Sequence, residues 1–133
     1  MNKLLLLSII GAIFILAGVG YKLFIAPSKP IPTEPPKTVE VSMIIHANTW
    51  KFVPNVIEVN EGDRVIAHIM NEDDYDHGFG IDAFGVNKRL WPKQVTTVEF
   101  TASPTGEYTF YCSVPCGEGH YEQTGKIIVN PRK

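Results

Sequence analysis

The sequence predicts an all-β domain of the Greek-key sandwich or barrel type, preceded by one apolar helix at the N-terminus. Two observations predict the β domain. After residue 37 the chain contains about seven short segments of alternating or β-branched apolar residues, and clusters of Gly, Pro and Asn separate them at regular intervals. After residue 26 no stretch shows the 3.6-residue periodicity of an amphipathic helix.

The N-terminal segment predicts a membrane anchor. Leu4 to Tyr21 is uncharged, and Lys22 is the only charge before the apolar run continues to Ala26. Because a helix of about 20 apolar residues spans a bilayer, and a lysine near its end can reach the interface, residues 1–26 are expected to form a single-pass signal anchor. Lys3 favours a domain on the outer, periplasmic side of the plasma membrane. A cleaved signal peptide is the alternative, but no clear A-x-A site follows.

Residues 27–37 are expected to form an extended, proline-rich linker, since the stretch APSKPIPTEPPK holds five prolines and little to bury. Residues 38–133 then form the predicted domain. This part carries eight Lys and Arg against thirteen Asp and Glu, a net charge of −5. Such a charge disfavours nucleic acid as a ligand and favours a basic partner protein.

The predicted strands follow from local patterns. Val39 to Ile45 alternates apolar and polar residues, which is typical of a half-buried strand. Asn55–Val59, the turn residues 60–63 and Arg64–Met70 predict a hairpin. Further strands are expected at 78–84, at 95–100, at 107–112 after the turn 103–106, and at 125–130. The residues between the last two strands then form one loop at an end of the sandwich.

This loop holds Cys112 and Cys116, the only cysteines of the chain, together with His120. A disulfide suits a domain outside the cytoplasm, but a bridge over three intervening residues constrains the unfolded chain little and leaves His120 unexplained. Zinc would need a fourth ligand from elsewhere. Copper prefers the combination of thiolate and imidazole, which His77 from a preceding loop would complete. The residues alone leave these three readings open.

Two segments carry a family resemblance. DDYDHGFGI, with His77, and CSVPCGEGHYEQTGKIIV, which begins at Cys112, resemble the CuA domain of cytochrome c oxidase subunit II, which is also found in nitrous oxide reductase. The family pattern is a His in an H-G-F-like context, then C-S-x-x-C-G-x-x-H-x-x-M and G-x-I-x-V. The similarity extends over nearly all of residues 47–130. It implies a cupredoxin-like fold that holds two copper ions in a dinuclear centre.

The resemblance also implies the ligands. The sulfurs of Cys112 and Cys116 would bridge the two ions, His77 and His120 would complete one ion each, and the backbone carbonyl of Val114 would contribute. Where the family has an axial methionine, this chain has Gln123. Because an amide oxygen is a harder donor than a thioether, Gln123 is expected either to favour the oxidised state and lower the reduction potential, or to leave one copper more weakly held.

The function implied is electron relay without catalysis in this chain, as subunit II or a similar partner of subunit I of a haem–copper oxidase, with electrons from a c-type cytochrome or another basic donor. A donor-docking role is expected for Trp50, Glu72, Asp73, Asp74 and Asp76. Structural or solvated roles are expected for His46, His68, Met43 and Met70. The alternatives are a free-standing copper carrier or metallation protein, a mononuclear cupredoxin with Gln123 as axial ligand, and a structural module with a disulfide.

Overall fold

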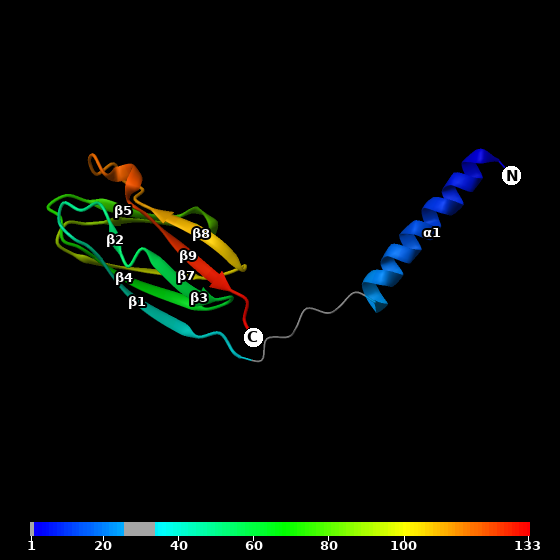
Figure 1. Cartoon of the computed structure of the whole chain (residues 1–133), viewed down its shortest axis with the longest axis horizontal. Coiled ribbons are helices and arrows are strands. Elements are labelled where there is room, and N and C mark those ends of the chain that lie inside the picture. Colours follow the sequence, from blue (N-terminus) through cyan, green and yellow to red (C-terminus); the bar gives the residue numbers. More distant parts are fainter. Residues whose placement is uncertain (1, 26–33) are drawn as a thin grey trace. The chain divides into compact units, whose positions relative to one another are not determined.

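The computed structural model describes residues 2–25 and 34–133. Helix α1 (Lys3–Phe24) and the domain form two separate compact units (Figure 1). The helix begins after Asn2, whose side chain accepts a hydrogen bond from the Leu4 N–H at 3.2 Å. Its length and composition suffice to cross a membrane. Of the expected linker 27–37, residues 27–33 lie outside the described part of the chain.

The domain consists of two β-sheets. Its described residues form strands β1 (Thr38–Ile45), β2 (Phe52–Val53), β3 (Val56–Asn60), β4 (Arg64–Asn71), β5 (His77–Ile81), β6 (Val86–Leu90), β7 (Val95–Thr101), β8 (Gly106–Tyr111) and β9 (Thr124–Asn130), and the short 3-10 helices η1 (Asp82–Phe84) and η2 (His120–Glu122). One sheet has the order β2-β1-β4-β7 and the other has the order β3-β9-β8-β5-β6. The predicted fold class is therefore confirmed.

The core lies between the sheets. Phe52 comes from the first sheet, Phe79 and Phe110 come from the second, and the three ring centroids lie 5.2–5.5 Å apart. All three side chains are almost fully buried, together with Met43. Met43 is therefore a packing residue, as expected. Since a large aromatic side chain buries an extensive apolar area, this cluster stabilises β5 and β8, which contribute two of its rings.

Two strands are parallel to partners that are distant in the sequence. β1 pairs with β4 from Thr38↔Arg64 to Ile45↔Asn71, and β3 pairs with β9 from Val56↔Lys126 onward. Because a hairpin cannot produce a parallel pair, the chain has to cross between the sheets, which is the Greek-key arrangement expected for this class.

The expected hairpin of residues 55–70 is wrong, because β3 and β4 lie in different sheets. The turn that joins them is held by neighbouring strand ends instead. Gly62 N–H donates to Ala102 O at 2.7 Å, Glu61 N–H donates to Asn130 O at 2.8 Å, and Asp63 accepts the Asn60 N–H at 2.9 Å. These bonds turn the chain across the sandwich. Strand β6 was not predicted either, since its three middle residues are polar and exposed.

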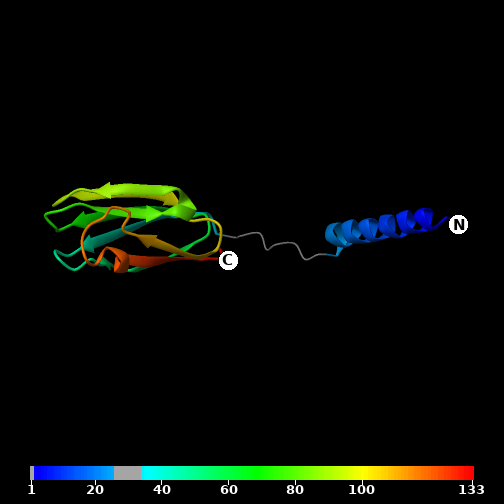
Figure 2. The same ribbon diagram turned by 90° about the horizontal axis from the view of Figure 1, so that it is seen from above.

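The end of the expected linker packs against the domain. Asp63 accepts the Lys37 N–H at 2.9 Å and forms a buried ion pair with Arg132, which also donates to Pro35 O at 2.9 Å. This attachment lies where β1 begins and β9 ends. The β8–β9 loop, coloured orange, lies toward the other end of the sandwich (Figure 2).

Candidate metal centre

Strand pairing brings the two predicted ligand segments together. His77 is the first residue of β5, Cys112 directly follows β8, and these strands are neighbours with Gly80 opposite Tyr111. Cys112 N–H donates to Gln123 O at 3.0 Å, which closes the loop from 112 to 123 at the start of β9. One rigid sheet therefore carries both segments.

Gly78 allows the close approach of β5 to the cysteine loop. A Cβ at this position would lie 2.3 Å from Ser113 Oγ and 2.7 Å from the Ser113 backbone nitrogen. The Gly78 N–H instead donates to Cys112 Sγ at 3.3 Å. A side chain here would separate His77 from Cys112, because backbone atoms cannot give way as a flexible side chain can.

The sulfur and nitrogen atoms form a compact group. The two Sγ atoms lie 3.4 Å apart, His77 Nδ1 lies 3.8 Å from Cys112 Sγ, and His120 Nδ1 lies 3.5 Å from Cys116 Sγ. The possible ligand atoms of His77, Cys112 and Cys116 are all within 4.8 Å of one another. Val114 O lies 3.1 Å from Cys112 Sγ. Each cysteine thus has its own histidine.

The two cysteines are free. Their sulfur separation of 3.4 Å is far longer than a disulfide bond of about 2.05 Å. Both thiols are buried, at 3% and 8% exposure, and they point into the space shared with the two histidines. The donor set therefore fits a soft or borderline metal ion, and thiolate with imidazole is the combination that copper prefers.

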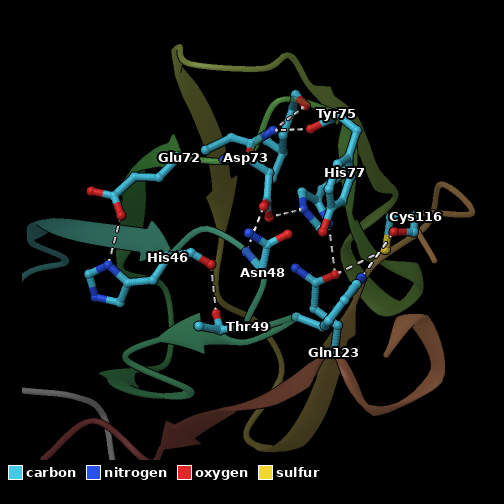
Figure 3. Close-up of polar contacts among 12 residues, drawn as sticks. His46, Asn48, Thr49, Glu72, Asp73, Tyr75, His77, Cys116 and Gln123 are labelled. Atoms are coloured by element: carbon cyan, nitrogen blue, oxygen red, sulfur yellow. Dashed lines mark hydrogen bonds and ion pairs between the residues drawn. The ribbon is translucent and has the colours of Figure 1, made fainter. Parts of the chain in front are cut away.

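His77 is fixed at both ring nitrogens (Figure 3). Its Nε2 lies 2.8 Å from Asp73 Oδ2, and its Nδ1 lies 2.9 Å from Gln123 Oε1. Asp73 also accepts the Asn48 N–H at 2.7 Å, and its own N–H donates to Asn71 Oδ1 at 2.9 Å. A carboxylate on one nitrogen of a ligating histidine sets the ring orientation and frees the other nitrogen for a metal.

The surroundings separate the two thiol pKa values. Burial alone would raise the pKa of Cys112, but hydrogen bonds from His77 and from the Gly78 N–H outweigh it and lower the pKa to about 6. Burial raises the pKa of Cys116 to about 12, and the neighbouring Cys112 adds to this. Burial lowers the pKa of His77, but the hydrogen bonds to Cys112 and Asp73 outweigh it and raise the pKa. The surroundings therefore favour the thiolate form at Cys112 and disfavour it at Cys116.

Gln123 is fully buried at the centre of the site. Its Oε1 lies 2.9 Å from His77 Nδ1 and accepts from the Cys116 thiol at 3.3 Å, whereas its Nε2 has no hydrogen-bond partner among the described residues. An unpaired buried donor is costly, and a metal cation would be held by the amide oxygen, not by this N–H group.

The structure thus brings together His77, Cys112, Val114, Cys116, His120 and Gln123, which the sequence predicted as ligands. The docking residues are not equivalent. Asp73 is 1% exposed, so it has no surface for a partner, and the expectation of docking is wrong for this residue because its carboxylate serves His77. Glu72 pairs with His46 at 2.8 Å, Asp74 pairs with Lys93 at 3.2 Å, and Asp76 pairs with Arg89. These three acids remain accessible to different degrees.

Three contributions were not predicted from the sequence. They are the carboxylate of Asp73 on His77, the close approach at Gly78, and the hydrogen bond from Trp50 Nε1–H to Cys116 O at 3.0 Å. Trp50 is only partly exposed. The acidic run before His77 contains a signal for the first contribution, since a histidine ligand often has a carboxylate nearby. Nothing in the local sequence distinguishes Asp73 from its neighbours.

A β-sandwich that gathers two cysteines and two histidines at one end has a donor set that suits a copper-binding protein. The model of the family described as "Cupredoxin-like domain" matches residues 14–129, and the chain belongs to this family. The sequence is 32% identical over 90 residues to cytochrome c oxidase subunit 2 of Thermus thermophilus, covering 68% of this chain and 66% of that protein. It is 36% identical over 76 residues to nitrous-oxide reductase of Stutzerimonas stutzeri, covering 55% of this chain and 12% of that protein.

The chain therefore spans just under two thirds of the first of these relatives. Solved structures share the fold. A heme-copper terminal oxidase dimer contains a chain with a TM-score of 0.62 at 23% identity, covering 95% of this chain and 96% of that one. The periplasmic domain of subunit II of cytochrome oxidase (CoxB) from Bradyrhizobium japonicum has a TM-score of 0.60 at 19% identity, covering 77% and 87%. The predicted resemblance to subunit II is confirmed.

Proposed function

We propose that this domain relays electrons through a dinuclear copper centre of the CuA kind. The observation that carries the proposal is the pairing of the ligands. Cys112 and Cys116 have their sulfurs 3.4 Å apart, and each has a separate imidazole nitrogen, at 3.8 and 3.5 Å. A site for one ion would need only one of the two cysteine–histidine pairs. A site for two ions that share both thiolates would use both pairs.

Each residue then has a definite part. The sulfurs of Cys112 and Cys116 would hold both ions, Nδ1 of His77 and of His120 would each hold one, and the carbonyl of Val114 and the amide oxygen of Gln123 would be the weaker donors. Copper bound there would supply reversible one-electron exchange. Asp73 keeps the imidazole of His77 oriented, and its buried carboxylate balances positive charge next to the site.

The scaffold shields the site from water and restricts its motion. His77 and Gln123 are fully buried, the two cysteines are nearly so, and only His120 among the proposed side-chain ligands is partly exposed. Since a rigid site changes little in geometry when it gains or loses an electron, this burial suits rapid transfer. The partly exposed edge of His120 is the proposed point of electron entry or exit.

We further infer the setting of this relay. The names of relatives include subunit 2 of cytochrome c oxidase, and helix α1 suffices to anchor the domain at a membrane. We propose that the domain lies on the outer side of a single-pass anchor, beside subunit I of a haem–copper oxidase, which reduces oxygen in another chain. The net charge of −5 on residues 38–133, the exposed Asp74 and the partly exposed Glu72 and Asp76 favour a basic electron donor such as a c-type cytochrome.

The test is the copper content and the electron paramagnetic resonance spectrum of the full chain in detergent, loaded with copper while the thiols are reduced and then oxidised by one electron with ferricyanide. Two ions per chain, with a hyperfine pattern from one electron shared by two nuclei, are expected. Cys116→Ser is the matched control, since it keeps one thiolate and should give a single-nucleus pattern. One ion with a single-nucleus pattern in the unaltered protein would instead favour the mononuclear or carrier alternative.

A further inference from the structure

We propose that Trp50 is a positioning residue for the metal site. Together with the rest of the loop 46–50, it fixes the position of the Cys116 segment relative to His77. This inference rests on the proposed copper function. Trp50 supplies no ligand atom. It contacts the segment that carries Cys116 and His120, while the same loop is bonded to the carboxylate that orients His77.

The indole of Trp50 contacts the loop that carries Cys116. Trp50 Nε1–H donates to the carbonyl of Cys116 at 3.0 Å. The ring then covers the next residues of the loop. A Cβ on Gly119 would lie 2.6 Å from Trp50 Cβ and Cγ, and one on Gly117 would lie 3.3 Å from Trp50 Cζ2. Gly117 has a φ of 118°, which side-chain-bearing residues rarely adopt. The indole therefore fits against a loop that is shaped to receive it.

The loop 46–50 has an unusual backbone conformation. Asn48 and Trp50 both have positive φ values, 59° and 48°. For a residue as bulky as tryptophan this backbone region is an outlier, and it persists only where the surroundings impose it. Here the surroundings do so, because Asn48 N–H donates to Asp73 Oδ1 at 2.7 Å and Thr49 Oγ1–H donates to His46 O at 2.7 Å. Figure 3 shows this turn beside Asp73.

Asp73 and Tyr75 connect this loop to His77. One oxygen of Asp73 accepts from the turn, and the other contacts His77 Nε2 at 2.8 Å. Trp50 also stacks on Tyr75, with ring centroids 6.4 Å apart, and the Tyr75 ring lies 5.2 Å from that of His77. A continuous set of contacts therefore runs from the Cys116 carbonyl through the loop to His77.

This arrangement has a consequence for the metal site. Cys112 is positioned by β8 and by the Gly78 N–H, but Cys116 lies outside any strand, in a segment with two glycines. Without the indole, the Cys116 carbonyl loses its donor and the ring no longer restrains Gly117 and Gly119. The distance between the two sulfurs would then depend on a loop with many accessible conformations.

The test replaces Trp50 by Phe, which removes the N–H but retains a ring, and measures copper release to a chelator, the hyperfine pattern and the midpoint potential. We expect about tenfold faster copper release, which is the lower end of what loss of a group supporting metal ligands causes. A changed hyperfine pattern is also expected, because the Cys116 sulfur is less well fixed. Trp91→Phe is the matched control, since Trp91 is the only other tryptophan, is 51% exposed and packs on Arg89.

If Trp50→Phe does not fold, incorporation of benzothienylalanine at position 50 keeps the size of the ring and removes only the N–H. The unaltered protein separates the two proposals. Failure of that protein to bind copper would contradict the proposed function. Normal copper binding, with release, hyperfine pattern and potential unchanged in the altered protein, would overturn the role of Trp50.

Discussion

Nε2 of His77 lies 2.8 Å from Oδ2 of Asp73, and neither side chain is more than 1% exposed. The pair is four residues apart along the chain, yet only the turn between β4 and β5 brings it together. Asn71 shapes that turn, since its amide donates to Tyr75 O at 2.9 Å and to Leu90 O at 3.2 Å. The orientation of one proposed metal ligand is thus decided by a turn held by a buried amide.

Asp73→Asn is expected to weaken copper binding about 10- to 100-fold, because the amide cannot balance charge on His77 and orients its ring less firmly. Competition with a chelator of known affinity measures this. Asp74→Asn is the matched control, since Asp74 is the next residue and its side chain is 90% exposed. Equal copper affinity in both variants would contradict the assigned role of Asp73.

Gln123→Met is expected to raise the reduction potential of the loaded protein, because a thioether favours the reduced copper ion more than an amide oxygen does. In the metal-free protein the same change removes the unpaired Nε2 but also the oxygen that contacts His77 Nδ1 and the Cys116 thiol, so a net loss of about 1–3 kcal/mol of stability is expected. Redox titration and urea unfolding measure the two effects. An unchanged potential would show that Gln123 does not act on the metal.

Gly78→Ala is expected to destabilise the domain by about 1–3 kcal/mol, as overpacking does, and to abolish the copper spectrum. The new Cβ would lie 2.3 Å from Ser113 Oγ, 2.7 Å from Ser113 N and 2.8 Å from Val114 N. Adding Ser113→Ala should not rescue the variant, because the two backbone nitrogens remain in place. Recovery of the spectrum in the double variant would show that only the serine hydroxyl matters.

The pair of Asp63 with Arg132 predicts a dependence of stability on pH. Burial raises the pKa of Asp63, but hydrogen bonds from the Lys37 N–H and from Arg132 outweigh it and lower the pKa from 3.8. A lowered pKa in the folded state means that the carboxylate contributes its full stabilisation above pH 3.8 and loses it as the pH falls through the lower, folded-state value.

Asp63→Asn should therefore cost about 3–5 kcal/mol near pH 6, because it leaves a buried guanidinium without its partner. Below pH 3.8 the difference from the unaltered protein should shrink. Urea unfolding of the metal-free protein at several pH values measures both. A difference that stays constant over this range would contradict the assignment of the titration to Asp63.

Asp74→Lys is expected to slow electron uptake from a basic donor several-fold at low ionic strength, with the effect fading as salt is added, since exposed charges act mainly on the association rate. Stopped-flow reduction at varied salt measures it. Glu58→Lys makes the same charge change at an exposed position of β3, outside the two segments that carry the ligands, and should have less effect. Equal effects would indicate that only net charge matters.

The ligand loop could be predicted from the sequence because its information is local. Cys112, Cys116, His120 and Gln123 lie within twelve consecutive residues between two recognisable strands, and their types and spacing limit the chemistry. His77 could be named as a candidate from its residue type and the family resemblance, but its distance from Cys112 depends on the pairing of β5 with β8. Local patterns do not encode that pairing.

The errors have a common origin in contacts between distant segments. Residues 60–63 have hairpin composition, but bonds to Ala102 and Asn130 direct the chain into the other sheet. The acidic run before His77 contains four carboxylates with similar local surroundings, and only the folded turn places Asp73 inside. Burial of a charged residue is decided by its partners, and a sequence does not display them.

Arg132 and Asp63 fasten the chain at one pole of the sandwich, and strand β1 runs from there toward the opposite pole, where the ligands are gathered. At about 3.3 Å per residue, its eight residues separate the two poles by about 25 Å. The attachment of the preceding segment and the geometry of the ligands are therefore structurally independent. In the membrane-anchored setting proposed above, a change in the length of the segment before Pro35 would alter how far the ligand pole can reach from the membrane without altering any contact around the sulfurs.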